Sequence, residues 1–113
     1  MDVSLIIYTV DDVTKAKQFF GKLLGADPYV DSPMYTGFKN GGVEIGLVAT
    51  GGKVPQSTLP YWNVDDIAAS VKSLVDAGGT IAQDVRDVGY GMLVASVKDA
   101  NGAAVGLRQP PKG

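Results

Sequence analysis

The chain has 113 residues, the size of one ordinary domain, and 45% of them are hydrophobic and 19% charged. Its net charge of −2 at pH 7 and its singly scattered basic residues argue against nucleic-acid binding, which needs clustered lysine and arginine. The sequence contains no cysteine and no histidine, which excludes disulfides, thiolate sites and the imidazole groups that most zinc enzymes and general bases use. No apolar run approaches the ~20 residues needed to span a membrane, so we expect a cytoplasmic protein without a membrane partner.

The first predicted element is an apolar strand over residues 4–8, and a similar segment returns at residues 58–62. Each is followed by a copy of one short motif, Thr9-Val10-Asp11-Asp12-Val13 and then Asn63-Val64-Asp65-Asp66-Ile67. Apolar side chains then recur at helical spacing, and aspartate is a favoured helix N-cap because its carboxylate accepts N–H groups of the first turn. Glycine ends each predicted helix, at Gly25 and at the pair Gly78-Gly79.

Each copy closes with a predicted hairpin. Asn40-Gly41 and Asn101-Gly102 each stand between apolar strands, and Asn-Gly favours a tight turn because both residues tolerate positive φ. We therefore expect one domain over residues 1–113, consisting of a half-unit at 1–50, a connector at 51–57 and a half-unit at 58–113. The predicted class is α+β, with two tandem βαβββ units whose mixed sheets curl into a cup and carry the helices on the outer face.

These motifs resemble those of the vicinal oxygen chelate superfamily, which includes glyoxalase I, bleomycin-resistance proteins and extradiol dioxygenases. The markers are Val-Asp-Asp before each helix, Phe19-Phe20-x-x-Leu23-Leu24-Gly25, and Asp99-x-Asn101-Gly102-x-x-Val105-Gly106-Leu107. The stretch from Leu59 to Asp66, followed by Ala77-Gly78-Gly79-Thr80, looks like small bacterial members of the glyoxalase/bleomycin-resistance type. The resemblance covers essentially the whole chain, and it implies a homodimer, the usual state of the drug-binding members.

The resemblance also indicates where a metal ion would be held. In the family's metalloenzymes, a His or Glu on the first strand and another on the closing strand of each half bind a divalent metal. The matching positions here are Leu5, Gly46, Leu59 and Gly106, whose side chains offer no lone pair. We therefore expect no metal and no other cofactor, which places the chain nearer the metal-free branch of the family than glyoxalase I or the dioxygenases.

Strand alternation predicts which side chains face the cup. If Leu5 faces the cup, so does Thr9. Alternation places Trp62 in the core behind the sheet, and the alternative is that it lies in a dimer cleft, where its ring stacks on a ligand. The register of the middle strands is open, so their large side chains divide between cavity and core: Tyr35, Phe38, Tyr90 and Met92. The predicted ligand-binding set is Thr9, Phe38, Glu44, Tyr61, Asn63, Tyr90, Met92 and Arg108.

Four members of this set have a structural interpretation beside the functional one. Glu44 is the candidate catalytic residue, as a general base, or else a cation receptor or a metal ligand away from the family's positions. Its structural interpretation is a solvated carboxylate or half of an ion pair with Arg108. Arg108 clamps an anion with two hydrogen bonds or is simply exposed. Asn63 binds a ligand or ties down the turn before the second helix. Tyr61 binds a ligand or is an ordinary wall residue.

Three functions are open on this evidence. The favoured one is a metal-free small-molecule-binding protein that holds a hydrophobic or aromatic ligand in the cup and sequesters a drug or metabolite. The second is a lyase or isomerase that uses Glu44 as acid and base. The third is an interaction or regulatory module with a vestigial cavity. The favoured function needs no enzymatic activity.

Overall fold

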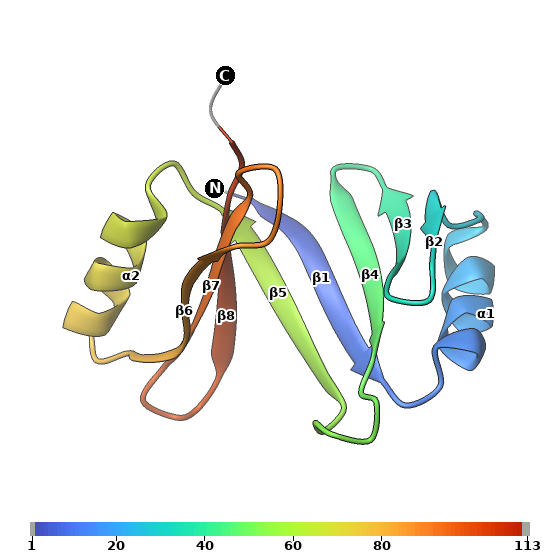
Figure 1. Cartoon of the computed structure of the whole chain (residues 1–113), viewed down its shortest axis with the longest axis horizontal. Coiled ribbons are helices and arrows are strands. Elements are labelled where there is room, and N and C mark those ends of the chain that lie inside the picture. Colours follow the sequence, from blue (N-terminus) through green and yellow to red (C-terminus); the bar gives the residue numbers. More distant parts are fainter. Residues whose placement is uncertain (1, 112–113) are drawn as a thin grey trace. The chain divides into compact units, whose positions relative to one another are not determined.

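Two successive βαβββ repeats make up the chain, as the computed structural model shows for residues 2–111 (Figure 1). The elements are β1 (Val3–Val10), α1 (Val13–Leu24), β2 (Val30–Asp31), β3 (Thr36–Asn40), β4 (Val43–Ala49), β5 (Ser57–Asn63), α2 (Ile67–Asp76), β6 (Thr80–Asp87), β7 (Leu93–Lys98) and β8 (Ala104–Gln109). They form two compact units, an N-terminal unit of Ser4–Leu59 and a C-terminal unit that begins at Pro60 and includes the start of β1. The predicted α+β class and the duplicated βαβββ order are confirmed.

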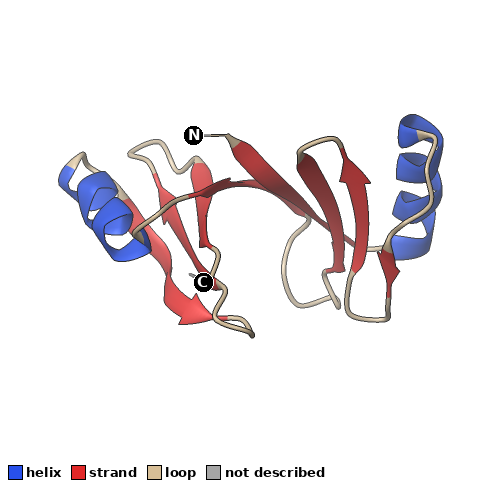
Figure 2. Ribbon diagram, turned by 90° about the horizontal axis from the view of Figure 1, so that it is seen from above, coloured by secondary structure: helices blue, strands red, loops and turns tan. Residues whose placement is uncertain are grey.

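The N-terminal unit contains a mixed four-stranded sheet in the order β2-β3-β4-β1. Strand β1 runs parallel to β4, and β3 is antiparallel to both β4 and β2. Helix α1 lies against one face of this sheet (Figure 2). Between them lie the buried residues Phe38, Ile45 and Leu47, against which pack Ile6, Tyr8, Val13, Ala16, Phe20, Leu24 and Val43.

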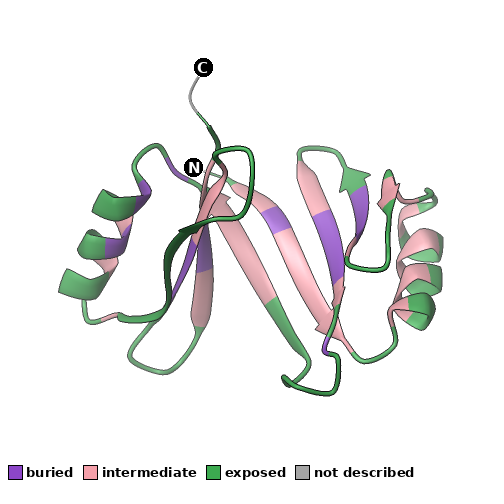
Figure 3. Cartoon of the chain, viewed as in Figure 1, coloured by how far each residue is buried: buried purple, intermediate pink, exposed green. Residues whose placement is uncertain are grey.

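The C-terminal unit repeats this plan in the order β5-β8-β7-β6. Strand β5 is parallel to β8, and β7 is antiparallel to both β8 and β6. The core between the sheet and α2 consists of Val64, Ile67, Val71, Ala95, Val97 and Leu107. In Figure 3 most of the buried residues lie on β3, β4, β7, β8 and α2, with others on β1 and in the loops that follow β4 and precede α2, whereas β6 is exposed along its length.

The repeated aspartates cap both helices, as the sequence predicts. Asp12 accepts a hydrogen bond from Lys15 N at 3.0 Å, and Asp66 accepts one from Ala69 N at 3.1 Å. Gly25 ends α1 in the left-handed conformation at φ 62°, which a residue with a side chain adopts only under strain. Within residues 2–111, neither helix is long and apolar enough to cross a bilayer.

In each unit one sheet face packs against the helix. Within residues 2–111 no helix of the same unit covers the other face, which we call the open face. Ile6 and Tyr8 of β1 belong to the core against α1, so Leu5, Ile7 and Thr9 project to the open face. Val64 of the C-terminal unit likewise lies in the core. Trp62 is paired with the core residue Leu107, so its predicted side of the sheet is confirmed. It is half-buried and borders a hollow together with residues of α2, so its predicted place in the core is not.

Candidate ligand-binding site

Two glycines lie side by side on the open face of the N-terminal unit. Gly37 on β3, Gly46 on β4 and Ile7 on β1 are directly paired across the sheet. A Cβ atom at Gly37 would lie 2.9 Å from ring carbons of both Tyr29 and Tyr35. A Cβ atom at Gly46 would lie 2.3 Å from the Tyr35 hydroxyl. The two glycines therefore make the space in which the tyrosine rings lie against the sheet.

Both tyrosine hydroxyls converge on one carboxylate oxygen. Tyr29 Oη donates to Glu44 Oε2 at 2.6 Å, and Tyr35 Oη donates to the same atom at 2.5 Å. Hydrogen bonds to an ionised acceptor are shorter and stronger than neutral ones. The Glu44 side chain is 14% exposed, so these two phenols replace much of the water that a surface carboxylate would have.

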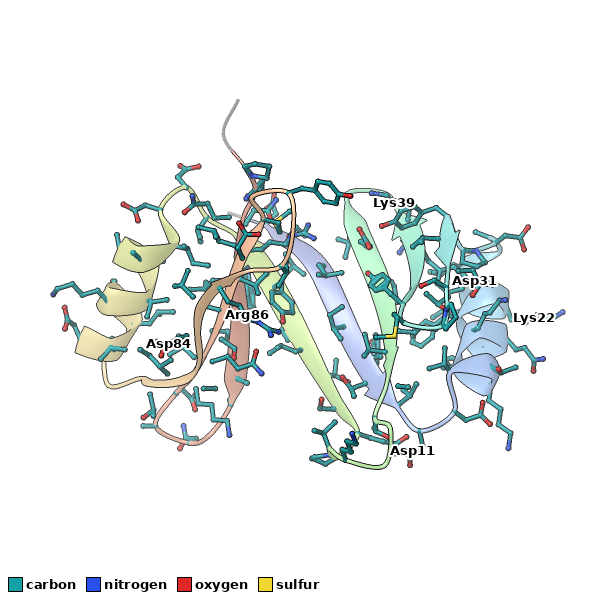
Figure 4. The ribbon with its side chains drawn as sticks, viewed as in Figure 1. Asp11, Lys22, Asp31, Lys39, Asp84 and Arg86 are labelled. Atoms are coloured by element: carbon teal, nitrogen blue, oxygen red, sulfur yellow. The ribbon has the colours of Figure 1, made fainter. Side chains whose placement is uncertain are left out.

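Lys39 adds a positive charge beside this cluster. It lies on β3 (labelled in Figure 4), and its Nζ atom is 3.7 Å from Glu44 Oε1 and 4.6 Å from the centre of the Tyr29 ring. The carboxylate is thus held between phenols at one oxygen and an ammonium near the other. Such a group can accept a hydrogen bond from a ligand or remove a proton from one.

The C-terminal unit places a tyrosine over a glycine in the same way. Tyr61 of β5 is paired with Gly106 of β8, and a Cβ atom at Gly106 would lie 2.5 Å from Cδ2 of the Tyr61 ring. One residue pair further along the strands, Arg108 Nε donates to Asn63 Oδ1 at 3.1 Å. Burial raises the pKa of the Tyr61 hydroxyl, while the positive charges of Arg86 and Arg108 act in the opposite direction.

Some residues of the predicted ligand-binding set do not lie together in the structure. Thr9 lies on the open face of the N-terminal unit and is paired with Val48. Phe38 is 0% exposed in the core against α1, so the expectation that it lines the cavity is wrong. Its register partner is the core residue Ile45, whereas Lys39 beside it projects to the other face.

The remaining predicted residues lie near the turn between β6 and β7. Tyr90 is fully exposed at a positive φ of 55° and lies in the turn, not on a middle strand as the sequence suggested. Met92 N donates to Gly89 O at 3.0 Å, which closes this turn immediately before β7. Neither residue belongs to the two tyrosine-over-glycine clusters. Their predicted contact with a ligand stays a prediction.

Three site residues were not in the predicted set: Tyr29, Tyr35 and Arg86. Tyr29 and Tyr35 flank the short strand β2, and only the pairing of Gly37 with Gly46 brings them to Glu44. The available signal was a pair of strand glycines, Gly37 and Gly46, because glycine within a strand often marks the close approach of another group. The position of Arg86 could be found only from the register of β6, which contains two irregularities.

The positions that hold metal in the family's metalloenzymes do not fit a metal ion here. Leu5 and Leu59 have hydrocarbon side chains, and the space beside Gly46 and Gly106 is taken by tyrosine side chains. Among residues 2–111 there is also no group of three or more acidic side chains close enough to hold a metal. Metal ligation at these positions would require both different residues and displaced tyrosines.

The chain belongs to the glyoxalase/bleomycin resistance protein/dioxygenase superfamily, whose family model matches residues 3–107. It is 33% identical over 112 residues to the protein named "Putative glyoxylase CFP32" in Mycobacterium bovis and in Mycobacterium tuberculosis. That match covers 87% of this chain but 41% of each relative, so the chain spans about two-fifths of their length.

Solved structures share the fold at lower sequence identity. The hypothetical protein BH1468 from Bacillus halodurans is 14% identical, with a TM-score of 0.79 over 99% of this chain and 96% of the other. Methylmalonyl-CoA epimerase from Mycobacterium tuberculosis is 16% identical, with a TM-score of 0.69 over 97% of this chain and 88% of the other. These likenesses establish the fold and leave the activity open.

The contact between Tyr61 and Gly106 predicts a steric cost. Gly106→Ala should lower the free energy of unfolding by about 1–3 kcal/mol, because the new methyl group overlaps the Tyr61 ring. Gly42→Ala is the matched control, since a Cβ atom there meets nothing within 4 Å. Urea denaturation should show the cost of Gly106→Ala largely disappearing in a Tyr61→Ala background. Equal costs in both backgrounds would contradict the contact.

The raised pKa of Tyr61 predicts a loss of stability in alkali. The folded state holds the Tyr61 proton to higher pH than the unfolded chain, so this contribution is complete below the ordinary value of 10.0 and is lost as pH rises through the higher folded value. The difference in tyrosinate absorbance between the native protein and Tyr61→Phe should have a midpoint above pH 10.0. A midpoint at or below that value would contradict the burial of this hydroxyl.

Proposed function

We propose that this protein binds a small organic molecule on the open faces of its sheets without using a metal ion. The observation that carries this proposal is the tyrosine side chain over each closing-strand glycine, at Gly46 and at Gly106. Where the family's metalloenzymes need a ligand atom, this chain has aromatic and phenolic groups. A tyrosine offers both a flat apolar surface and a hydroxyl, which suits the recognition of an organic ligand.

The composition of the open faces supports a hydrophobic or aromatic ligand with a few polar atoms. Ile7 and Val48 provide apolar area on the open face of the N-terminal unit, beside the Glu44 carboxylate, whereas Leu5 on the same face is buried. On the C-terminal unit, Tyr61 provides an aromatic ring beside the polar pair Asn63 and Arg108. Apolar walls with a small number of placed polar groups are typical of small-molecule sites. Sequestration of a drug or metabolite requires binding alone, without a catalytic group.

An enzyme of the lyase or isomerase type is the second candidate. It is favoured by Glu44, whose Oε2 atom is fixed by two phenols while its Oε1 atom lies 3.7 Å from Lys39 Nζ. A carboxylate positioned in this way is suited to moving a proton. The epimerase among the structural neighbours carries out its own reaction on the same fold, which makes catalysis by this chain worth testing.

The homodimer and the cytoplasmic location stay predictions.

Nuclear magnetic resonance distinguishes organic from metal binding on one sample. We expect neutral aromatic probes such as indole and 2-naphthol to shift the amide signals of Thr9, Gly46, Tyr61 and Arg108 in a saturable way. We expect manganese(II) chloride to leave the same signals sharp, because the side chains at the family's metal positions offer it no ligand atom. Selective broadening around Gly46 and Gly106, or aromatic shifts confined to the two helices, would contradict the proposal.

Glu44→Gln separates the two candidate functions. The amide keeps the size of the carboxylate and loses its basicity, so a binding protein should hold the aromatic probes with little change. An enzyme should lose its turnover while it keeps its affinity for them.

A further inference from the structure

A hollow of about 620 Å³ lies on the helix side of the C-terminal unit, between α2 and Trp62. Helix α2 packs over β6, β7 and β8, whereas β5 is the next strand beyond β8. Trp62 on β5 projects to the helix side, because it is paired with the core residue Leu107. The helix does not cover it fully, so the indole ring is half-buried and forms one wall of the hollow.

The side of α2 that borders this hollow carries small side chains. Ala69, Ser70 and Ser73 line it, and they lie three or four residues apart, which places them on one face of the helix. Their methyl and hydroxymethyl groups do not reach across to the indole ring. The hollow therefore exists because small residues of α2 stand opposite the large residue of β5.

The N-terminal unit fills the corresponding place with an aromatic pair. Tyr8 and Trp62 each lie four residues before the aspartate that caps the helix. Phe20 and Leu74 each lie eight residues after it. In the first repeat the ring of Phe20 packs on that of Tyr8, with the ring centres 4.8 Å apart. In the second repeat Leu74 has no ring, and within residues 2–111 no aromatic ring packs on Trp62.

The charged groups at the hollow are both acidic. Asp65 and Asp66 line it, and no lysine or arginine does. Asp66 caps α2 through its Oδ1 atom, whereas the Asp65 carboxylate has no hydrogen bond or ion pair in the described part of the chain. Asp11, which takes the place of Asp65 in the first repeat, accepts a hydrogen bond from the Thr50 hydroxyl at 2.6 Å. The two carboxylates outweigh the roughly half positive charge at the start of a helix.

We infer that this hollow binds a small organic cation, an ammonium group on an apolar body, with its positive charge between the Trp62 ring and the Asp65 carboxylate. Among side chains, the indole ring attracts a cation over its face most strongly, and quaternary ammonium ions are recognised in this way. The volume of the hollow is within the range of small-molecule sites. This site lies on the face opposite to the open face and goes beyond the proposed function.

Fluorescence titration tests the inference directly, because Trp62 is the only tryptophan of the sequence. The probes are benzyltrimethylammonium, the neutral benzyl alcohol and the anion benzenesulfonate. The cation should change the Trp62 emission in a saturable way and bind more weakly at higher ionic strength, because salt screens the attraction to the carboxylates. Benzyl alcohol should bind at least three-fold more weakly than the cation, and benzenesulfonate more weakly still.

Three variants separate the charge of the site from its shape. Asp65→Asn should weaken the cation about three- to five-fold, the effect of losing one solvent-screened ion pair, and leave benzyl alcohol unchanged. Asp84→Asn is the matched control, because it removes the same charge from the exposed strand β6 of the same unit (labelled in Figure 4) and should change the affinity by less than about 1.5-fold. Leu74→Phe should abolish the response without any change of charge, because its ring would lie on Trp62 as Phe20 lies on Tyr8.

Equal affinities for the cation and benzyl alcohol, with no effect of Asp65→Asn, would overturn the cation site. Trp62 emission that changes with protein concentration alone would also overturn it, because a second copy of the chain would then occupy the hollow. If Leu74→Phe does not fold, the comparison of Asp65→Asn with Asp84→Asn decides alone. Either failure leaves the proposed function standing, because that function is tested by signals of the opposite face.

Discussion

The absence of a side chain at Gly46 and Gly106 is the constraint on which both open faces depend. At each position a Cβ atom would lie within 2.5 Å of a tyrosine side chain, so the tyrosine can lie against the sheet only because the residue is glycine. Gly37 extends the same gap across β3, where the rings of Tyr29 and Tyr35 lie. An imidazole or carboxylate at Gly46 or Gly106 would supply a metal ligand but would exclude the tyrosine. Metal ligation and the observed packing are therefore alternatives at the same two positions.

The two open faces differ in charge, although the units that carry them are built alike. Both sheets consist of a parallel strand pair extended by antiparallel strands, with the core on the helix side. On the N-terminal unit the central group is the Glu44 carboxylate, held by two phenols. On the C-terminal unit it is a pair of guanidinium groups beside one phenol. The two open faces therefore carry opposite charges on the same duplicated scaffold.

The sequence predicts the scaffold well because its signals are local. The repeated Asp12 and Asp66 cap the helices, and alternation along β1 and β5 places Tyr8 and Trp62 on the helix side. The candidate site is harder to predict from the sequence, because it depends on which residues are paired across neighbouring strands. Phe38 and Lys39 are neighbours, yet one fills the core and the other faces Glu44, and only the pairing with β4 decides which. Because β6 contains two irregularities, strand alternation along the sequence cannot predict which face Arg86 occupies.

Native mass spectrometry of protein isolated without chelators or metal-affinity steps tests the central claim most directly. The account predicts the mass of the metal-free polypeptide, alone or with an organic adduct whose mass begins to identify the ligand. Gentle ionisation keeps a tightly held metal ion in place, so its presence would be seen. One metal ion per chain that survives this isolation would contradict the account, because the side chains at Leu5, Gly46, Leu59 and Gly106 offer no atom to hold it.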